Sequence, residues 1–558
     1  MRPMNTMIQP ISPTAVPSVV KTSTSKTSTS KRWRSRLPKL LSGSLACTLL
    51  LPGISSLQGA NEFESNFSAQ RANWNTSGNW TRVTGVGDIP KTVADSVKII
   101  ALADRRDIIV NVDDIHINLL EYAAPAIGVD PDAQYIFADG TRTLTVNTLT
   151  KNGSQSTAVA NGKISNVEQS LSLVIGDLNI NSGTFNIGFG TSTNSIGGLD
   201  AFNVTGKTTV STGTSLFFRG VQNRNPETNH IQLGHLQLSG TGKLVLGGNG
   251  NSTGTVEVFS LSGNGLVRVG DNSTNNGTAG TLHINSKNAS AETFSGTLQD
   301  YINVNNPAKL TILKTGTGTQ VFSRSAGNTY SGTTTINEGV LAVTNTTTTS
   351  SGLGTGPVEV GGTGILAGKG FIAPGTRLVF ADEEDEDGTE VGNTITVHTG
   401  GSIAPSAHLL THEATKLTLN GADNLGATIL DMEEGSSFRF RLGADNTSDS
   451  LHFSNYHAGG LQLFSGGIDV NVLGIQEGVF NLLTFSSITE NELDTLAGLL
   501  NAGSGFGGYT ATFYGDGTTI SLQVDAIPEP RETALLLMGL AGLVGWRRYQ
   551  KRQSIRLC

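Results

Sequence analysis

Between residues 310 and 372 the chain consists of short apolar runs that are interrupted every few residues by Gly, Asn, Ser or Thr. Alternating apolar residues, as in Leu310/Ile312 and Leu341/Val343, are typical of strands that bury one face. The small and polar residues between these runs are typical of tight turns. The segment therefore predicts consecutive short β-strands with no helix between them, and it restricts the chain to an all-β architecture.

Three motifs in this segment are L-K-T-G-T-G-T at 313–319, N-T-Y-S-G at 328–332 and I-N-E-G-V-L-A-V at 336–343. Together they resemble the autotransporter-associated β-strand repeat of large bacterial surface proteins. The resemblance implies a coil of a β-solenoid outside the cell, where each turn of chain buries its faces against its neighbours. It implies no catalytic motif.

A second self-similarity lies upstream, where L-Q-L-S-G-T-G-K-L-V-L-G at 236–247 aligns with F-S-L-S-G-N-G-L-V-R-V-G at 259–270. The offset of this alignment is 23, as from Leu238 to Leu261, and it suits one turn of a solenoid. A chain rich in Gly, Ser and Thr also matches itself by chance, and this alternative stays open. If the period holds, roughly 15 to 20 coils stacked about 4.8 Å apart would form a rod on the order of 70 to 100 Å long.

The composition and charge agree with an extended β-protein. Glycine provides 70 of the 558 residues, and apolar residues still make up 37%. Cys47 and Cys558 are the only cysteines, and both lie in the end segments, so the body has no disulfide framework. Residues 61–530 contain 23 basic and 44 acidic side chains, a net charge of −21. This charge argues against nucleic acid as a partner and favours cations or positively charged matrix components.

Residues 1–60 have the pattern of a secretory signal peptide with an extended n-region. The basic run K-R-W-R-S-R at 31–36 precedes an apolar stretch at 40–51, and small residues follow near Ala60. The apolar stretch is too short for a stable membrane span. We therefore expect export across the inner membrane.

The C-terminal end has three consecutive parts: Pro528-Glu529-Pro530, the apolar stretch 533–546, and a basic cluster that begins with Arg547 and Arg548. This order resembles the PEP-CTERM sorting signal of exopolysaccharide-producing Gram-negative bacteria. The resemblance implies cleavage near 528–530 by an exosortase, a transpeptidase-like membrane protease. It also implies that 533–546 is held transiently in the inner membrane, with the basic cluster on the cytoplasmic side. A plain C-terminal tail anchor is the alternative.

The predicted fold is all-β: a right-handed parallel β-helix (β-solenoid) with a small β-rich C-terminal cap, an N-terminal signal helix and a C-terminal transmembrane sorting helix. The expected parts are the signal at 1–60, the solenoid body at 61–425, the cap at 426–526 and the sorting signal at 527–552. The cap should contain one helix, because Thr489 and Glu492 form a capping box. Its apolar face would consist of Leu493, Leu496, Leu499 and Leu500, and Gly503 would end it.

Trp74 and Trp80 stand at the beginning of the body in a W-x5-W arrangement. Exposed tryptophans stack on sugar rings, because aromatic faces suit the apolar surfaces of sugars. Alternatively, they close the open end of the solenoid, as terminal coils must be covered. Closure of the end is the favoured interpretation.

Searches for catalytic and metal-binding patterns give few candidates. The acidic run at 382–387 has enough carboxylates for Ca²⁺ but lacks the spacing of a calcium loop, so a solvated loop is favoured. The segment around Lys207 lacks the first glycine of a phosphate-binding loop, since Ala201 stands there. The Asp113/Asp114 and Asp130/Asp132 pairs are the only carboxylates that suggest a glycan-cleaving centre.

The sequence thus predicts a secreted, non-enzymatic structural or adhesive protein of the cell surface or exopolysaccharide matrix of a Gram-negative bacterium. No catalytic, cofactor or metal residue is assigned. The expected partners are an exosortase-type protease, the exopolysaccharide or surface matrix, and transiently the inner membrane. The alternative is a β-helix polysaccharide lyase or hydrolase.

Overall fold

The computed structural model describes residues 61–554 except for 66–70, 86, 100–106, 114, 123–133, 139, 153–155, 160–169, 188–197, 219–229, 248–253, 271–278, 288–289, 302–307, 380–388, 407–413, 422–427 and 528–529. The predicted signal peptide, Asp114, Asp130, Asp132, the acidic run 382–387, Pro528 and Glu529 lie outside the described residues. The described residues form 42 β-strands and two α-helices, so the all-β prediction is confirmed.

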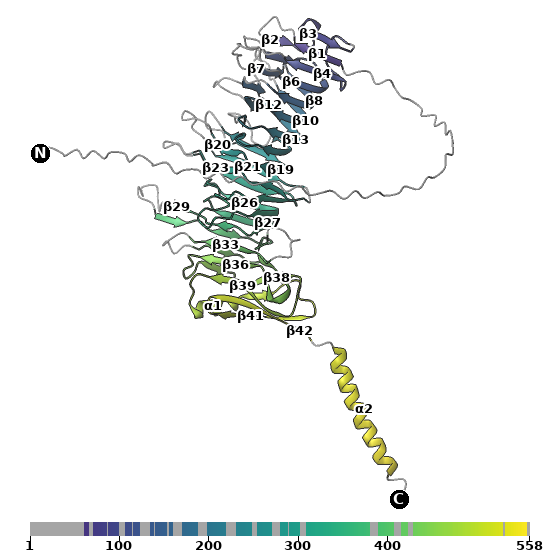
Figure 1. Ribbon diagram of the computed structural model, residues 1–558, viewed down its shortest axis with the longest axis vertical. Helices are drawn as coiled ribbons and strands as arrows, with labels where there is room; N and C mark the ends of the chain where they lie inside the picture. Colours follow the sequence, from purple (N-terminus) through teal and green to yellow (C-terminus); the bar gives the residue numbers. More distant parts are fainter. Residues whose placement is uncertain are drawn as a thin grey trace, which may run out of the picture. The chain divides into compact units, whose positions relative to one another are not determined.

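The strands build a parallel solenoid in which each turn of chain, called a coil here, stacks on the previous one (Figure 1). Strand β10 (Ser170–Ile180) shows the plan, because it runs along β8 (Thr141–Lys151) in one constant register over the whole length of both strands. The two strands bend at Gly176, where a Cβ atom would lie 2.3 Å from the carbonyl oxygen of Asn147. A third segment, β11 (Thr184–Ile187), pairs with β9 (Ser156–Val159) in another sheet. Each such coil therefore has three strand segments.

The largest sheet holds the first two segments of the coils. Its strands are β1 (Asn61–Ser65), β3 (Trp80–Thr84), β4 (Asp95–Ile99), β6 (Ile115–Tyr122), β8, β10, β12 (Gly198–Val204), β13 (Lys207–Val210), β15 (His230–Gln232), β16 (His235–Leu238), β18 (Gly254–Val258), β19 (Ser260–Gly263), β21 (Gly280–Asn285), β22 (Glu292–Phe294), β24 (Leu310–Thr315), β25 (Thr319–Phe322), β26 (Thr334–Val343), β27 (Val358–Gly368), β31 (Ile395–Val397), β32 (Ser402–Ala404), β34 (Leu430–Met432), β35 (Ser437–Arg441), β37 (Leu461–Leu463), β38 (Ile468–Leu473) and β40 (Leu500–Ala502).

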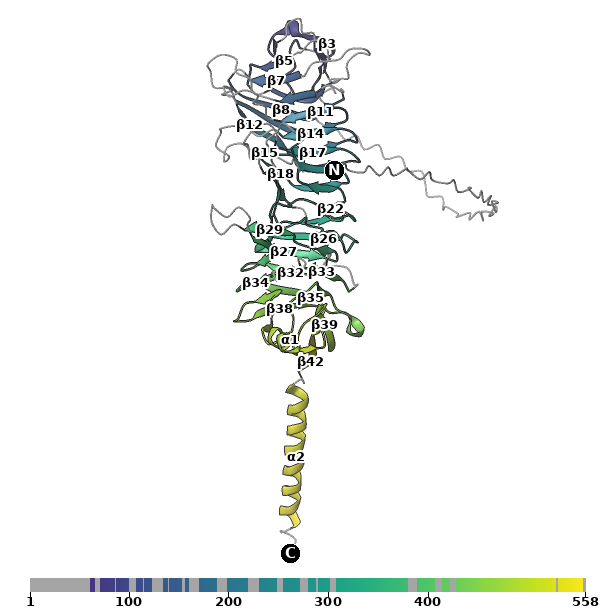
Figure 2. The ribbon, with the colours of Figure 1, turned by 90° about the vertical axis from the view of Figure 1, so that its left-hand side faces the viewer.

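Two further sheets supply the third segment, as Figure 2 shows from another side. The first contains β2 (Arg71–Asn73), β5 (Asp107–Val110), β7 (Gln134–Ala138), β9, β11, β14 (Ser215–Phe218), β17 (Lys243–Leu246), β20 (Leu266–Val269) and β23 (Thr297–Gln299). The second contains β28 (Phe371–Ile372), β33 (Lys416–Asn420), β36 (Ser450–Ser454), β39 (Gly478–Phe485), β42 (Thr519–Ala526) and β41 (Tyr509–Asp516). A separate hairpin joins β29 (Thr376–Val379) to β30 (Thr389–Gly392).

The core lies inside the coils and is built from columns of like residues. Leu144, Leu173 and Phe202 lie opposite one another on β8, β10 and β12, and all three are fully buried. Because side chains alternate between the two faces of a strand, the residues between them point outward and are polar or small. Parallel stacking therefore turns the sequence alternation into a continuous apolar interior.

The predicted period is correct for one face of the coils and wrong for another. On the third face Leu244 lies opposite Val267, at the predicted offset of 23. On the second face Leu236, not Leu238, lies opposite Leu261, so the offset there is 25. Elsewhere the offset is 29 between β6 and β8 and 37 between β27 and β31, so the coils do not share one length.

The two tryptophans belong to the core of the first coil, as the favoured interpretation predicted. Trp74 is fully buried and Trp80 nearly so, with their ring centroids 5.0 Å apart. The indole nitrogen of Trp74 donates to the carbonyl of Pro90 at 2.6 Å, and that of Trp80 donates to the carbonyl of Trp74 at 2.7 Å. These rings are therefore inaccessible to a sugar.

The other end of the solenoid is closed by antiparallel strands and a helix. Strand β39 pairs in antiparallel fashion with β42, which pairs with β41. Helix α1 (Glu490–Ala497) begins at the predicted cap, since the hydroxyl of Thr489 accepts from the backbone N–H of Glu492. Its predicted end is wrong: the helix stops at Ala497 rather than near Gly503, because Leu500 joins β40 and pairs with Ile468.

Helix α2 (Pro530–Ser554) contains the predicted helical stretch 533–546. Among the described residues, neither helix combines the length and the apolarity that a membrane crossing needs. This finding does not confirm the expected transmembrane helix at 533–546. The physical reason is that the apolar stretch stops at Trp546 and is followed at once by Arg547 and Arg548.

Candidate functional site

Those predicted site residues that the structure describes do not converge on one centre. Pro530 is the first residue of α2, and Arg547 and Arg548 are exposed on the same helix. Asp113 is exposed and accepts from the guanidinium of Arg142 at 2.8 Å. A single exposed carboxylate with an arginine partner is not a pair of catalytic carboxylates, which glycoside cleavage requires. The described residues therefore assemble no glycan-cleaving pair at this position.

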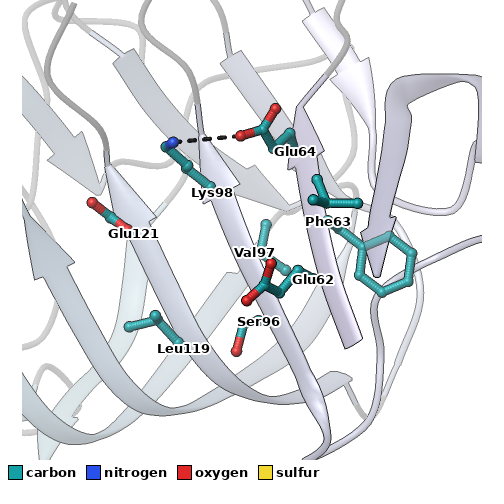
Figure 3. Close-up of a pocket in the computed structure, with 9 residues that line it drawn as sticks. Glu62, Phe63, Glu64, Ser96, Val97, Lys98, Leu119 and Glu121 are labelled. Carbon is teal, nitrogen blue, oxygen red and sulfur yellow. Dashed lines mark hydrogen bonds and ion pairs between the residues drawn. The ribbon is translucent and has the colours of Figure 1, made fainter. Parts of the chain in front are cut away.

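A hollow on the outer face of the first coils, of about 250 Å³, is lined mainly by β1, β4 and β6 (Figure 3). Lys98 of β4 lies in register between Glu64 of β1 and Glu121 of β6, and its ammonium is 3.4 Å from Glu64. Glu62 and the half-exposed Val83 also line the hollow. Three carboxylates outnumber one ammonium, so the hollow favours cationic over anionic groups.

Across the described ranges, no group of three or more His, Cys, Asp or Glu side chains is arranged to hold a metal ion. The acidic run at 382–387, the candidate for Ca²⁺ binding, is outside these ranges.

The repeat segment has a buried cation at its corner. The ammonium of Lys314 donates to the carbonyls of Thr315 at 2.8 Å, Gly316 at 2.7 Å and Glu338 at 3.0 Å. Burial lowers the pKa of Lys314 to about 8, and the nearby carboxylate of Glu338 opposes this shift. Glycines complete the corner, because a Cβ atom at Gly339 would lie 2.3 Å from the carbonyl oxygen of Gly316. The lysine thus supplies one donor group to three carbonyls of the tight turn, and the carbonyl of Thr315 also accepts from the backbone N–H of Ser286 at 3.0 Å.

The N-T-Y-S-G motif connects three coils. The side chain of Asn328 accepts from the backbone N–H of Leu298 at 2.9 Å and donates to the carbonyl of Gly352 at 2.7 Å. The hydroxyl of Tyr330 lies 2.7 Å from that of Thr334, and burial raises the pKa of the tyrosine. These contacts lie in the interior, so the motif positions chain rather than ligand.

A buried glutamine forms hydrogen bonds where the backbone ladder between β19 and β22 is incomplete. These strands share one register pair near the end of each strand. The side chain of Gln320 accepts from the N–H of Leu261 at 3.0 Å and donates to the carbonyls of Leu261 at 2.8 Å and Glu292 at 3.1 Å. The amide therefore takes the place of missing backbone partners.

Sequence reasoning missed Lys314 and Gln320, although a signal was present. Both occupy inward positions of strands whose other inward residues are apolar, such as Ile312 before Lys314 and Phe322 after Gln320. A polar residue at an apolar position of the alternation predicts a buried side chain that bonds to the backbone.

Comparison with known families agrees with this geometry. Residues 312–343 match the model of the passenger-associated-transport-repeat. No curated protein is similar enough to the chain to count as a relative. The matched range includes Lys314 and Gly339 of the corner, and also Gln320 and Asn328. The match indicates a β-helical, passenger-type protein that is exported to the surface or secreted.

Proposed function

We propose that this chain is a secreted, non-enzymatic structural or adhesive protein, folded as a right-handed parallel β-helix and sorted by an exosortase-type protease. Its destination is the surface or exopolysaccharide matrix of a Gram-negative bacterium. The observation that supports this proposal most strongly is the continuous parallel stacking from β4 to β38, with an apolar interior and outward polar columns. Such a stack offers long, rigid surfaces but, among the described residues, few convergent functional groups.

The tail supports the sorting part of the proposal. The tripeptide Pro528-Glu529-Pro530 ends at the first residue of α2, which carries an apolar stretch followed by basic residues. In the proposed mechanism, 533–546 contacts the inner membrane transiently and Arg547 and Arg548 stay on the cytoplasmic side. The protease cleaves near 528–530 and releases the acidic body.

Peptide mapping of inner-membrane, surface and matrix fractions tests the sorting step. We expect the exterior form to lack the segment after Pro530, and Glu529→Ala to retain the intact tail in the inner-membrane fraction. An Arg531→Ala variant, next to the motif, is the matched control. An exterior form that keeps the tail would contradict sorting.

Binding to isolated exopolysaccharide tests the matrix role. The net charge of −21 between residues 61 and 530 suggests contact through cations or with cationic matrix groups. We expect retention that is weakened by salt or by a chelator. Cleavage of the polysaccharide by the wild-type chain, lost in Asp113→Asn, would instead support an enzyme.

A further inference from the structure

The junction after β27 is the place where the solenoid changes its construction. Strands β26 and β27 share nine register pairs, whereas β27 shares three with β31 and three with β32. The third face changes there too, since β23 ends one sheet and β28 begins the other. The ladder is therefore thinner after β27 than between β26 and β27, at a place where coils of different length meet.

A histidine bridges this junction at its outer edge. His398, directly after β31, places its Nε2 2.5 Å from Glu359 of β27 and its Nδ1 2.8 Å from Glu433, which follows β34. Each carboxylate belongs to a different neighbouring coil. An imidazole donates from both nitrogens only in its protonated form, so both bonds require the imidazolium.

We infer that Glu359, His398 and Glu433 form a pH-dependent link that holds the coil of β31 to the coils before and after it. The link is complete when His398 is protonated. When the ring loses a proton, one bond is lost and the carboxylates face each other without a cation between them. The coil of β31 is then held less tightly to the coils before and after it, while those coils keep their own backbone hydrogen bonds.

The electrostatics of the cluster support the inference. The hydrogen bonds from Glu359 and Glu433 raise the pKa of His398 above its ordinary value near 6.5. The titratable groups that face the cluster from the neighbouring coils are Glu359 of β27, Asp431 of β34 and Glu433, which follows β34. Burial together with Glu433 raises the pKa of Asp431. Because the folded pKa of His398 is the higher one, its contribution is fully present below about pH 6.5 and is lost as pH rises through the raised value.

The chain contains a natural comparison for this arrangement. Lys98 lies between Glu64 and Glu121 in the same strand-to-strand fashion. The ordinary pKa of a lysine side chain, about 10.4, is far above that of histidine, about 6.5. A lysine would therefore make a permanent link, whereas the histidine at position 398 makes one that responds near neutral pH.

Amide hydrogen exchange of the full-length chain between pH 5.5 and 9, scaled for intrinsic exchange rates, tests the inference. The reporters are the N–H groups of His398 and Glu433, which donate to Val360 and Val397 across the junction. We expect protection in the wild type to fall by roughly tenfold as pH rises, the equivalent of about one pKa unit. His398→Lys should stay protected throughout, and His398→Gln should be less protected at every pH.

A pH profile in His398→Gln that equals the wild-type profile would overturn the inference. His283→Gln, at another histidine with a carboxylate neighbour, is the matched control and should leave the junction unchanged. If substitutions of His398 impair folding, Glu359→Gln provides an independent test. This substitution should move the midpoint pH, at which hydrogen-exchange protection is half lost, below its wild-type value. An unchanged midpoint pH would contradict the link.

Discussion

The coils of the repeat segment and the coils near the C-terminal end enclose the same core with different lengths of chain. Thr319 is stacked on Val340 in the repeat segment, whereas Ile365 is stacked on Ser402, which lies much farther along the chain. An inward column nevertheless continues beyond the repeat segment, from Val358 to Ile395 and Leu430. The inward side chains thus stay stacked whatever the length of the coil. The extra residues of the longer coils lie outside the stacked strands.

The two regions differ in how they make their corners. In the short coils the corner is buried and consists of glycines and the ammonium of Lys314. In the long coils the corner is open to solvent, and His398 and Glu433 are about half exposed. Short coils therefore depend on close packing and buried hydrogen bonds, and long coils depend on surface electrostatics.

The largest expected effect is that of Gly339→Val. Gly339 has a φ of +68°, and a Cβ atom there would approach the carbonyls of Gly316 and Gly318 to 2.3 and 2.6 Å. Backbone strain and this clash together should lower the free energy of unfolding by about 3 kcal/mol or more. Denaturant unfolding followed by circular dichroism measures the loss. Gly507→Ala, where nothing lies within 4 Å of the added carbon, is the control and should change little.

A second test removes the buried cation by Lys314→Met. Three carbonyl oxygens would lose the ammonium as a donor, although that of Thr315 keeps the N–H of Ser286, and each buried group left unsatisfied costs about 1 to 3 kcal/mol. Allowing for relaxation, we expect a loss of about 3 kcal/mol and faster hydrogen exchange in 310–343. Lys309→Met removes an exposed lysine of the same coil and should be nearly neutral. If Lys314→Met and Lys309→Met lowered the free energy of unfolding equally, the burial of the Lys314 ammonium would not distinguish this corner from an open one.

Gln320→Leu should have a smaller effect than the loss of the lysine. The substitution keeps side-chain volume but leaves the N–H and C=O of Leu261 without the amide, at a cost of about 2 kcal/mol. Hydrogen exchange at Leu261 reports the change directly. Gln237→Leu, at an outward position of β16, is the matched control. Unchanged protection at Leu261 would show that the amide does not replace the ladder.

The sequence was sufficient to predict the strands and the burial of Trp74 and Trp80, because alternation and end closure are local patterns. It was not sufficient for the register. The turn between Leu238 and Lys243 is longer by two positions than that between Gly263 and Leu266, which changes the offset from 25 to 23. A change of two keeps every side chain on its face, so the apolar pattern does not reveal it.

The polar sites also divide into those that a local pattern indicates and those that depend on the register between coils. Lys314 was detectable in principle as a polar residue at an inward position, because its strand alone defines that position. Glu359, His398 and Glu433 come from three coils whose lengths differ, and their sequence separations, 39 and 35, match no fixed period. Only the folded register brings these three side chains together.

The smallest expected effect concerns His452, a second histidine of the long coils. Burial and the charge of Lys416 lower the pKa of His452, whereas hydrogen bonds raise that of His398. The unfolded chain therefore binds the proton of His452 more readily, and stability is lost as pH falls below about 6.5. His452→Gln should reduce this acid-side loss, with a change in the unfolding midpoint of about 1 to 2 °C at pH 5. His116→Gln, on an outward position of β6, is the control. A larger acid-side loss in His452→Gln than in the wild type would contradict the lowered pKa of His452, and burial would then not distinguish this strand position from the open corner at His398.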